Sequence, residues 1–166
     1  MRGPEGTPVG QLRRVNISNF VVYNADSRYA SIISGIPGND IEDVKLRDIR
    51  IYYKGGGTQE QAAINPPENE KKYPEPNMFG IIPAYGFFIR HVKGIEMSNV
   101  EVSYMNDEQR PAYVLNDVKG ADFSNIKAQH AANSPVFILK NVENFNTHQC
   151  KSLKDVSLKT VTEKKL

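Results

Sequence analysis

The sequence predicts an all-β protein, a parallel β-helix (solenoid) of about five coils with one long loop insertion, and three observations support this fold class. An eleven-residue pattern of apolar and polar positions recurs along the chain. Within each copy apolar residues alternate with polar ones, which is typical of a strand with one buried face. The eighth position of every copy is polar. Self-similarity at this spacing indicates stacked repeats rather than a compact globular core.

The copies align without gaps inside the pattern. They begin at Leu12, Ile41, Val92, Val118 and Val142. Their eighth positions are Asn19, Asp48, Asn99, Asn125 and Gln149. We expect a ladder of tight structural corners at these residues, because Asn tolerates the left-handed backbone region better than most residues.

A third short strand is expected before each of the later copies, in FFIR at Phe87, YVLN at Tyr113 and FILK at Phe137. Three strands in a rung of roughly 25 residues agree with one coil of a parallel β-helix. The leucine-rich repeat is of similar length, but it requires a helical segment and a regular Leu/Asn consensus, and the sequence has neither.

The chain is predicted to be a single domain over residues 1–166. Residues 1–11 are rich in Gly and Pro and should be irregular. The loop insertion, residues 54–84, begins with KGGG and continues through NPPENEKKYPEPN, so it should lie on the surface. A loop of this length is usually functional or disordered. Residues 153–166 alternate again and predict a C-terminal edge strand or tail.

The N-terminal end of the array has no recognisable cap. The first copy already has a fully apolar interior face, and nothing before Leu12 looks amphipathic enough to cover it. Solenoids normally need a polar cap to stay soluble. We therefore expect a fragment that begins inside a longer helix, with assembly into a homo-oligomer through the open N-terminal coil as a further option.

Composition excludes several classes of protein. Only 39% of residues are hydrophobic and Trp is absent, which suits a solenoid with a thin interior. The net charge of +2 is too small and dispersed for nucleic-acid binding. Because no apolar run reaches roughly 18 residues, no membrane span is expected. Cys150 is the single cysteine and cannot form an internal disulfide.

The sequence predicts neither a cofactor nor a metal site. The glycines after Lys54 lack the Gly-Lys element and the following helix of a phosphate-binding loop. His91, His130 and His148 do not lie at metal-ligand spacing with another His or Cys. We interpret them as exposed or corner histidines.

Carboxylates deserve separate consideration, because glycoside hydrolysis needs two acids that converge across the scissile bond. The acids expected on outward strand faces are Glu96, Glu101, Asp122 and Glu143. Lysines and arginines stand beside them, which favours a solvated charged face over a catalytic pair. No catalytic residue is assigned.

Long stretches of the chain resemble a known family. They are RGPEGTP at Arg2, YNADSRYASIISGIPGNDIEDVKLRDIRIYYKGGG at Tyr23 and YPEPNMFGIIPAYGFFIRHVKGIEMSNVEV at Tyr73. With the rung pattern, they are similar to the C-terminal portion of glycoside hydrolase family 28, in its bacterial polygalacturonase-like subgroup. The resemblance covers about residues 2–150 and implies a right-handed parallel β-helix.

The resemblance implies inverting hydrolysis of galacturonic-acid-containing chains, with pectic or other uronate polysaccharide as the partner. For the intact family it implies a periplasmic or secreted location. The family hallmarks Asn-Thr-Asp, Asp-Asp, Gly-His-Gly and Arg-Ile-Lys are absent here. We therefore expect the catalytic coils to be missing and the chain to be inactive by itself.

Some aromatic and basic residues of the chain are still expected to contact sugar. Aromatic rings stack on sugar faces, and Arg or Lys can pair with uronate carboxylates. Arg28, Tyr29 and Tyr73 are the candidate substrate-binding residues, whereas Phe79 and Tyr85 are interpreted as pinning the loop onto the coil beneath. The alternative to an enzyme fragment is a non-catalytic carbohydrate-binding β-helix module.

Overall fold

The computed structural model describes residues 6–151 and 153–166 of an all-β chain. The strands are β1 (Arg13–Ala25), β2 (Ser31–Ser34), β3 (Ile41–Gly55), β4 (Phe87–Asn106), β5 (Tyr113–Ser124), β6 (Lys127–Ala128), β7 (Phe137–His148) and β8 (Val156–Lys165). Helical structure is confined, in the described residues, to α1 (Gln59–Ala62) and the 3-10 turn η1 (Pro76–Phe79). No described helix is long and apolar enough to cross a membrane.

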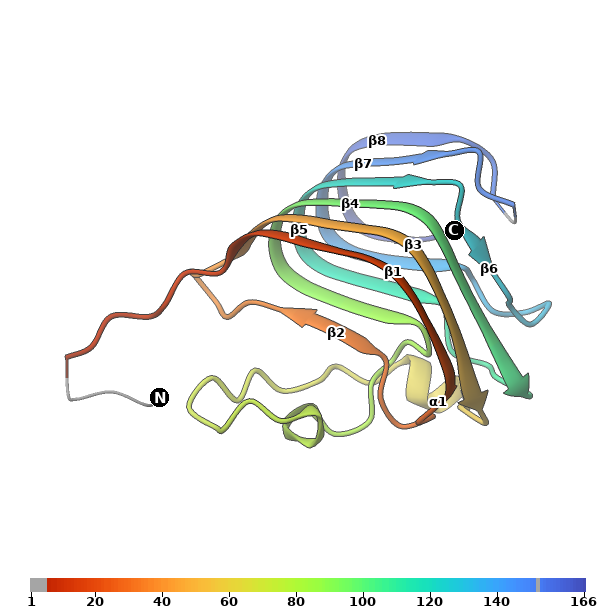
Figure 1. Ribbon diagram of the computed structural model, residues 1–166, viewed down its shortest axis with the longest axis horizontal. Coiled ribbons are helices and arrows are strands. Elements are labelled where there is room, and N and C mark those ends of the chain that lie inside the picture. The colour runs from red at the N-terminus through yellow and green to blue at the C-terminus, as the bar shows by residue number, and fades with distance from the viewer. Residues whose placement is uncertain (1–5, 152) are drawn as a thin grey trace.

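The strands form one mainly parallel sheet in the order β1-β3-β4-β5-β7-β8. Each long strand bends and stacks beside the next in a curved layer (Figure 1). The short strands β2 and β6 both pair with β4, near its beginning and its end. The last pair departs from the parallel pattern, because β8 runs antiparallel to β7.

The register of the sheet superimposes the sequence repeats. Ile41 pairs with Val92, Val92 with Val118, and Val118 with Val142. The Leu12 carbonyl accepts a hydrogen bond from the Glu42 amide at 3.0 Å. This contact extends the same alignment to the first copy of the repeat. Equivalent positions of successive copies are therefore direct neighbours.

The chain turns between strand segments at residues with positive φ, which recur in three columns of the described structure. The residues expected at corners all have φ between 50° and 61°: Asn19, Asp48, Asn99, Asn125 and Gln149. In this column Asn99 donates to Asp48 at 2.6 Å and Asn125 donates to Asn99 at 3.2 Å. The second column, at the third repeat position, consists of Arg14, Asp43, Gly94, Gly120 and Asn144. The third precedes the repeat and contains His91, Asp117 and Asn141.

The expected third strands are present, but they are not separate elements. FFIR, YVLN and FILK begin β4, β5 and β7 and pair with one another in that order. A single-residue corner in the third column joins each of them to the repeat that follows. Hydrogen bonding therefore continues through the corner, and each segment merges with the next strand.

Stacked aromatic rings fill much of the interior. Phe87, Tyr113 and Phe137 occupy equivalent positions, with ring centroids 5.6 Å apart in the first pair and 4.7 Å in the second. Phe123 and Phe145 meet Phe137 at 5.0 and 5.3 Å. All five side chains are at most 1% exposed. The parallel register produces this core, because it stacks like residues on like.

The first strand is the least covered part of the sheet. Ile17 and Val21 of β1 are 44% and 53% exposed, and Leu12 just before it is 56% exposed, whereas Ile49 and Ile51 of β3 are buried. At the other end, Val161 of β8 is 8% exposed and packs against the core.

Stability is expected to fall at alkaline pH. Tyr53 is buried and donates to the Gly86 carbonyl at 2.8 Å, and burial raises its pKa from 10.0 to about 12. Between these values the folded state keeps a proton that the unfolded state loses, so the free energy of unfolding decreases as pH rises. Urea unfolding at about pH 8 and about pH 11 measures this decrease. Tyr53→Phe should be less stable at the lower pH but show a shallower decrease. An unchanged pH slope in the variant would contradict this assignment.

Candidate functional site

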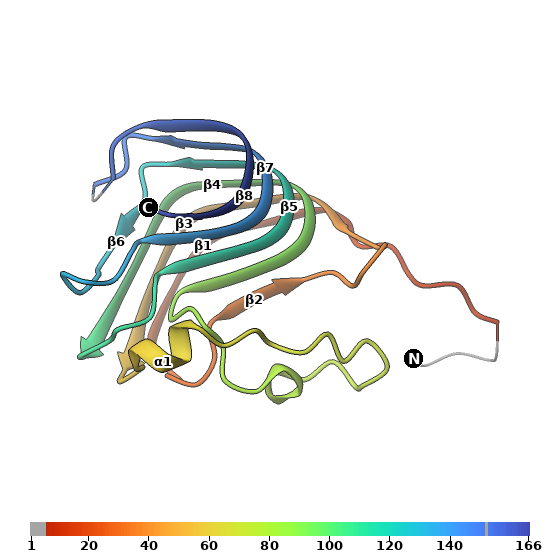
Figure 2. The same ribbon diagram turned by 180° about the vertical axis from the view of Figure 1, so that it is seen from behind.

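The 54–84 loop, whose first two residues still belong to β3, lies against the outer face of the sheet and forms the candidate site with it (Figure 2). A second hydrophobic cluster fixes the loop there. On the sheet side it contains Ile32, Phe88, Val114 and Ile138. On the loop side it contains Phe79, Ile82 and Ala84. Outward residues of adjacent strands therefore become buried beneath the loop.

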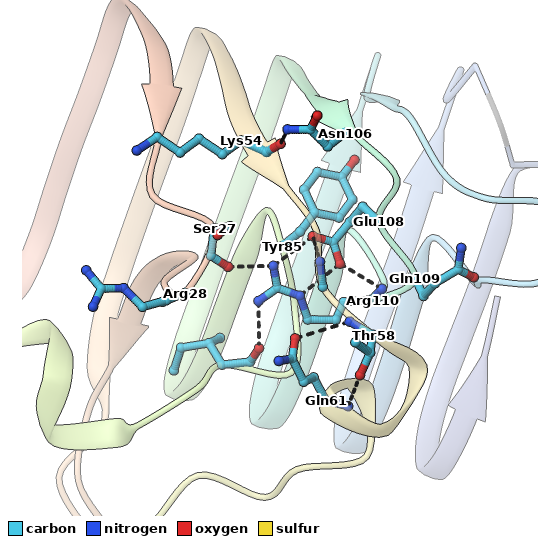
Figure 3. Close-up of polar contacts among 12 residues, drawn as sticks. Ser27, Arg28, Lys54, Thr58, Gln61, Tyr85, Asn106, Glu108, Gln109 and Arg110 are labelled. Carbon is cyan, nitrogen blue, oxygen red and sulfur yellow. Dashed lines mark hydrogen bonds and ion pairs between the residues drawn. The ribbon is translucent and has the colours of Figure 1, made fainter.

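A buried ion pair holds the start and end of the loop together (Figure 3). Glu108 and Arg110 are each 1% exposed and their charged ends are 2.7 Å apart. Glu108 accepts a hydrogen bond from the Gly57 amide at 3.1 Å. Arg110 donates to the Ile82 carbonyl at 3.2 Å and to the Ser27 carbonyl at 2.6 Å. One ion pair thus connects three segments that are distant in sequence.

Position 57 must be a glycine, because the side chains of Glu108 and Arg110 lie too close to leave room for a Cβ atom there. A Cβ atom there would lie 2.0 Å from Nε of Arg110 and 2.1 Å from Oε1 of Glu108. Neither side chain can yield, because both are buried and held by several hydrogen bonds. Gly57, the third glycine of the KGGG stretch, therefore allows the loop to pack against this ion pair.

A second arginine anchors the middle of the loop. Arg90 of β4 is 1% exposed and donates to the carbonyls of Pro66 and Pro67 at 2.8 and 3.2 Å. It also pairs with Glu68 at 3.1 Å. Burial lowers the pKa of Arg90, and the nearby acids Glu68 and Glu70 oppose this effect.

His91, the corner residue after Arg90, is surrounded by carboxylates. Its Nδ1 lies 2.6 Å from Asp117, and its Nε2 lies 3.2 Å from each carboxylate oxygen of Glu68. The residue is 8% exposed. The interpretation of His91 as a corner residue agrees with its φ of 52°, but it is buried rather than exposed.

A cavity of about 590 Å³ lies between the loop and the turn after β2. Its lining contains Ser34, Gly35, Ile36, Glu68, Glu70, Lys71, Lys72, Tyr73, Pro74, Met78 and Phe79. This volume lies within the range of small-ligand sites. Two lysines, two glutamates and two aromatic rings border it, so it combines charged and apolar surfaces.

The structure separates the three predicted sugar-binding residues. Tyr73 lines the cavity and is 52% exposed. Arg28 lies in the turn between β1 and β2, where it forms an ion pair with Asp26 at 2.9 Å and stacks over the Tyr29 ring at 5.2 Å. The Arg28 contact lowers the pKa of Asp26 to about 2. Neither Arg28 nor Tyr29 is among the described residues that line the cavity.

The outward carboxylates lie beside cations or amides of neighbouring strands. Glu96 pairs with Lys45 at 3.2 Å, and Glu101 pairs with Arg50 at 3.3 Å. Asp122 accepts a hydrogen bond from Asn146 at 2.9 Å. These contacts agree with a solvated charged face.

Sequence reasoning missed Lys71, Lys72 and the two buried arginines. The lysines were hidden in a charged stretch, EKKY, which reads as ordinary surface loop. Arg90 carries a usable signal, because it ends an otherwise apolar strand segment next to the loop that it binds. Comparison with sequence models of protein families, with curated proteins and with solved structures gave no match.

Proposed function

We propose that this chain is a right-handed parallel β-helix from a polygalacturonase-like glycoside hydrolase of family 28, and that it binds uronate-containing polysaccharide without cleaving it by itself. The stacked register of the repeats supports the β-helix, because equivalent positions of successive copies pair directly. Right-handedness follows the strong preference of parallel strand crossovers. The sequence resemblance supports the family.

The cavity beneath the 54–84 loop is the observation that carries the binding proposal. Tyr73 and Phe79 offer aromatic faces for a sugar ring. Lys71 and Lys72 provide cations for a uronate carboxylate. Glu68 and Glu70 offer acceptors for sugar hydroxyls. Such a combination suits an acidic sugar better than a neutral apolar ligand.

We expect no hydrolysis by this chain, and the placement of the acids supports that expectation. Inverting glycosidases hold two carboxyl groups roughly 6.5–9.5 Å apart around the scissile bond and an attacking water. Glu96 and Glu101 instead form ion pairs with Lys45 and Arg50 on the adjacent strand. Incubation of the chain with polygalacturonate should therefore release no reducing ends.

Calorimetric titration with short galacturonate oligosaccharides tests the binding site. Tyr73→Ala should weaken binding about two- to twelvefold, since ring contacts of this kind contribute roughly 0.5–1.5 kcal/mol. The double variant Lys71→Gln/Lys72→Gln should weaken oligosaccharide binding further and should remove the dependence of the affinity on salt concentration.

The matched control is Lys93→Gln/Lys119→Gln, which removes two exposed lysines from paired strand positions outside the cavity lining. It should bind as the wild type does. Equal affinity in all variants, or no heat with millimolar oligosaccharide, would rule out this cavity as the sugar site.

A further inference from the structure

We propose that Asp40, His91 and Asp117 bind a divalent first-row transition cation, with Zn²⁺ as the reference ion. One ligand atom from each residue can be chosen so that all lie within 4.8 Å of one another. The three residues come from different copies of the repeat. None of the three lines the cavity, but Glu68, whose carboxylate lies 3.2 Å from His91 Nε2, does line it.

The register of the sheet creates the cluster. Asp40, His91 and Asp117 immediately precede Ile41, Val92 and Val118, which pair across β3, β4 and β5. They therefore occupy equivalent positions of three neighbouring rungs, although only His91 and Asp117 have positive φ. Spacing along the sequence conceals this arrangement, since the members are separated by whole rungs.

Carboxylates face both nitrogens of the His91 ring. A neutral imidazole has one donor and one acceptor nitrogen. Here both nitrogens face carboxylates, at 2.6 Å for Asp117 and 3.2 Å for Glu68. A neutral ring leaves one nitrogen lone pair directed at a carboxylate. A metal ion between Nδ1 and the acids would remove this conflict.

A metal ion bound to Nδ1 of His91 would give each carboxylate around the ring a role. Asp117 and Asp40 supply oxygen ligands, and the Nε2 proton is donated to Glu68. A carboxylate that accepts from the second nitrogen is the usual partner of a metal-binding histidine, because it fixes the tautomer and the ring orientation. Asp117 is 42% exposed at its side chain, so it can shift to bonds of about 2.0–2.2 Å.

The donor set and its charge indicate the class of ion. One imidazole nitrogen and two carboxylate oxygens suit Zn²⁺ or a neighbouring divalent ion, with water completing the coordination. The two aspartates balance the charge of the ion. The charge of Glu68 is already balanced by Arg90, 3.1 Å away. Because Glu68 belongs to the 54–84 loop, the ion would also stabilise the docked loop.

Calorimetric titration of the full chain with ZnCl₂, at neutral pH in a non-chelating buffer, tests this site. Wild type should bind one ion, and Asp117→Asn should weaken binding at least tenfold. Asp48→Asn is the matched control, because Asp48 occupies another corner column with φ 56° against 55° for Asp117. Asn adopts positive φ readily at both positions, so each substitution removes a carboxylate without straining the backbone. Asp48→Asn should bind Zn²⁺ as tightly as wild type.

Two further variants distinguish a metal ligand from a structural contact. His91→Asn keeps a residue suited to φ 52° and should abolish both the heat of binding and the rise of Tm with ZnCl₂. Glu68→Gln should weaken binding by about 10- to 100-fold while keeping one ion per chain. If wild type shows no binding at millimolar ZnCl₂, or if His91→Asn and Asp117→Asn bind as tightly as wild type, these residues hold no metal ion and the proposal is wrong.

Discussion

Replacing Glu108 with alanine is expected to lower the free energy of unfolding by about 3–5 kcal/mol. The substitution leaves the Arg110 guanidinium buried at 1% exposure without the carboxylate that lies 2.7 Å away. It also removes the acceptor of the Gly57 amide. The start of the 54–84 loop, its end and the Ser27 turn are held through this pair, so the loop should detach first. Urea denaturation and limited proteolysis of the loop measure the two effects.

Asp107→Ala is the control for this substitution. Asp107 is adjacent in sequence but exposed, so its replacement should change the stability by no more than about 0.5 kcal/mol. Glu108→Gln keeps hydrogen-bond acceptors but removes the charge, and should fall between the two. A Glu108→Ala protein within about 1 kcal/mol of wild type would show that the ion pair does not hold the loop.

Phe137→Ala is the second substitution with a large expected effect, a loss of about 3–5 kcal/mol. Its ring is fully buried and stacks on Tyr113 at 4.7 Å with an interplanar angle of 15°. Phe123 and Phe145 contact its other sides. Removal of the ring leaves a cavity that the flanking strands cannot close, since their hydrogen-bonded register fixes their spacing.

The matched comparison is Tyr23→Ala. Tyr23 also stacks on an aromatic ring, Tyr52, at 4.9 Å and 6°, but it is 70% exposed. Its loss should be no larger than about 1 kcal/mol, because little apolar surface leaves water there. Equal losses for the two variants, measured by chemical denaturation, would contradict a core built on the aromatic column.

The register of the sheet could be predicted because the repeat contains it. Alternation of apolar residues marks the strands, and Asn at a fixed position marks one corner. The second corner column escaped notice because its residues are mixed: Arg14 and Gly94 occupy equivalent places. The repeat does not encode the path of the 54–84 loop, which the structure alone revealed.

The candidate site was predictable only in part. Tyr73 was accessible to reasoning because an aromatic residue in a polar loop is unusual. The Glu108–Arg110 pair was not, since its partners Gly57, Ile82 and Ser27 lie far away in sequence. Whether a charged side chain is buried depends on which segment of the chain covers it. The sequence pattern around Glu108 and Arg110 does not indicate that segment.

The most direct test of the account compares two oligosaccharides of equal length by calorimetric titration, one with free galacturonate carboxylates and one with methyl esters. We predict that wild type binds the acid form more tightly, and that Lys71→Gln/Lys72→Gln loses this preference. The preference should also weaken as salt is added. Equal affinity of wild type for both ligands, or binding of neither, would contradict a uronate-binding role for this chain.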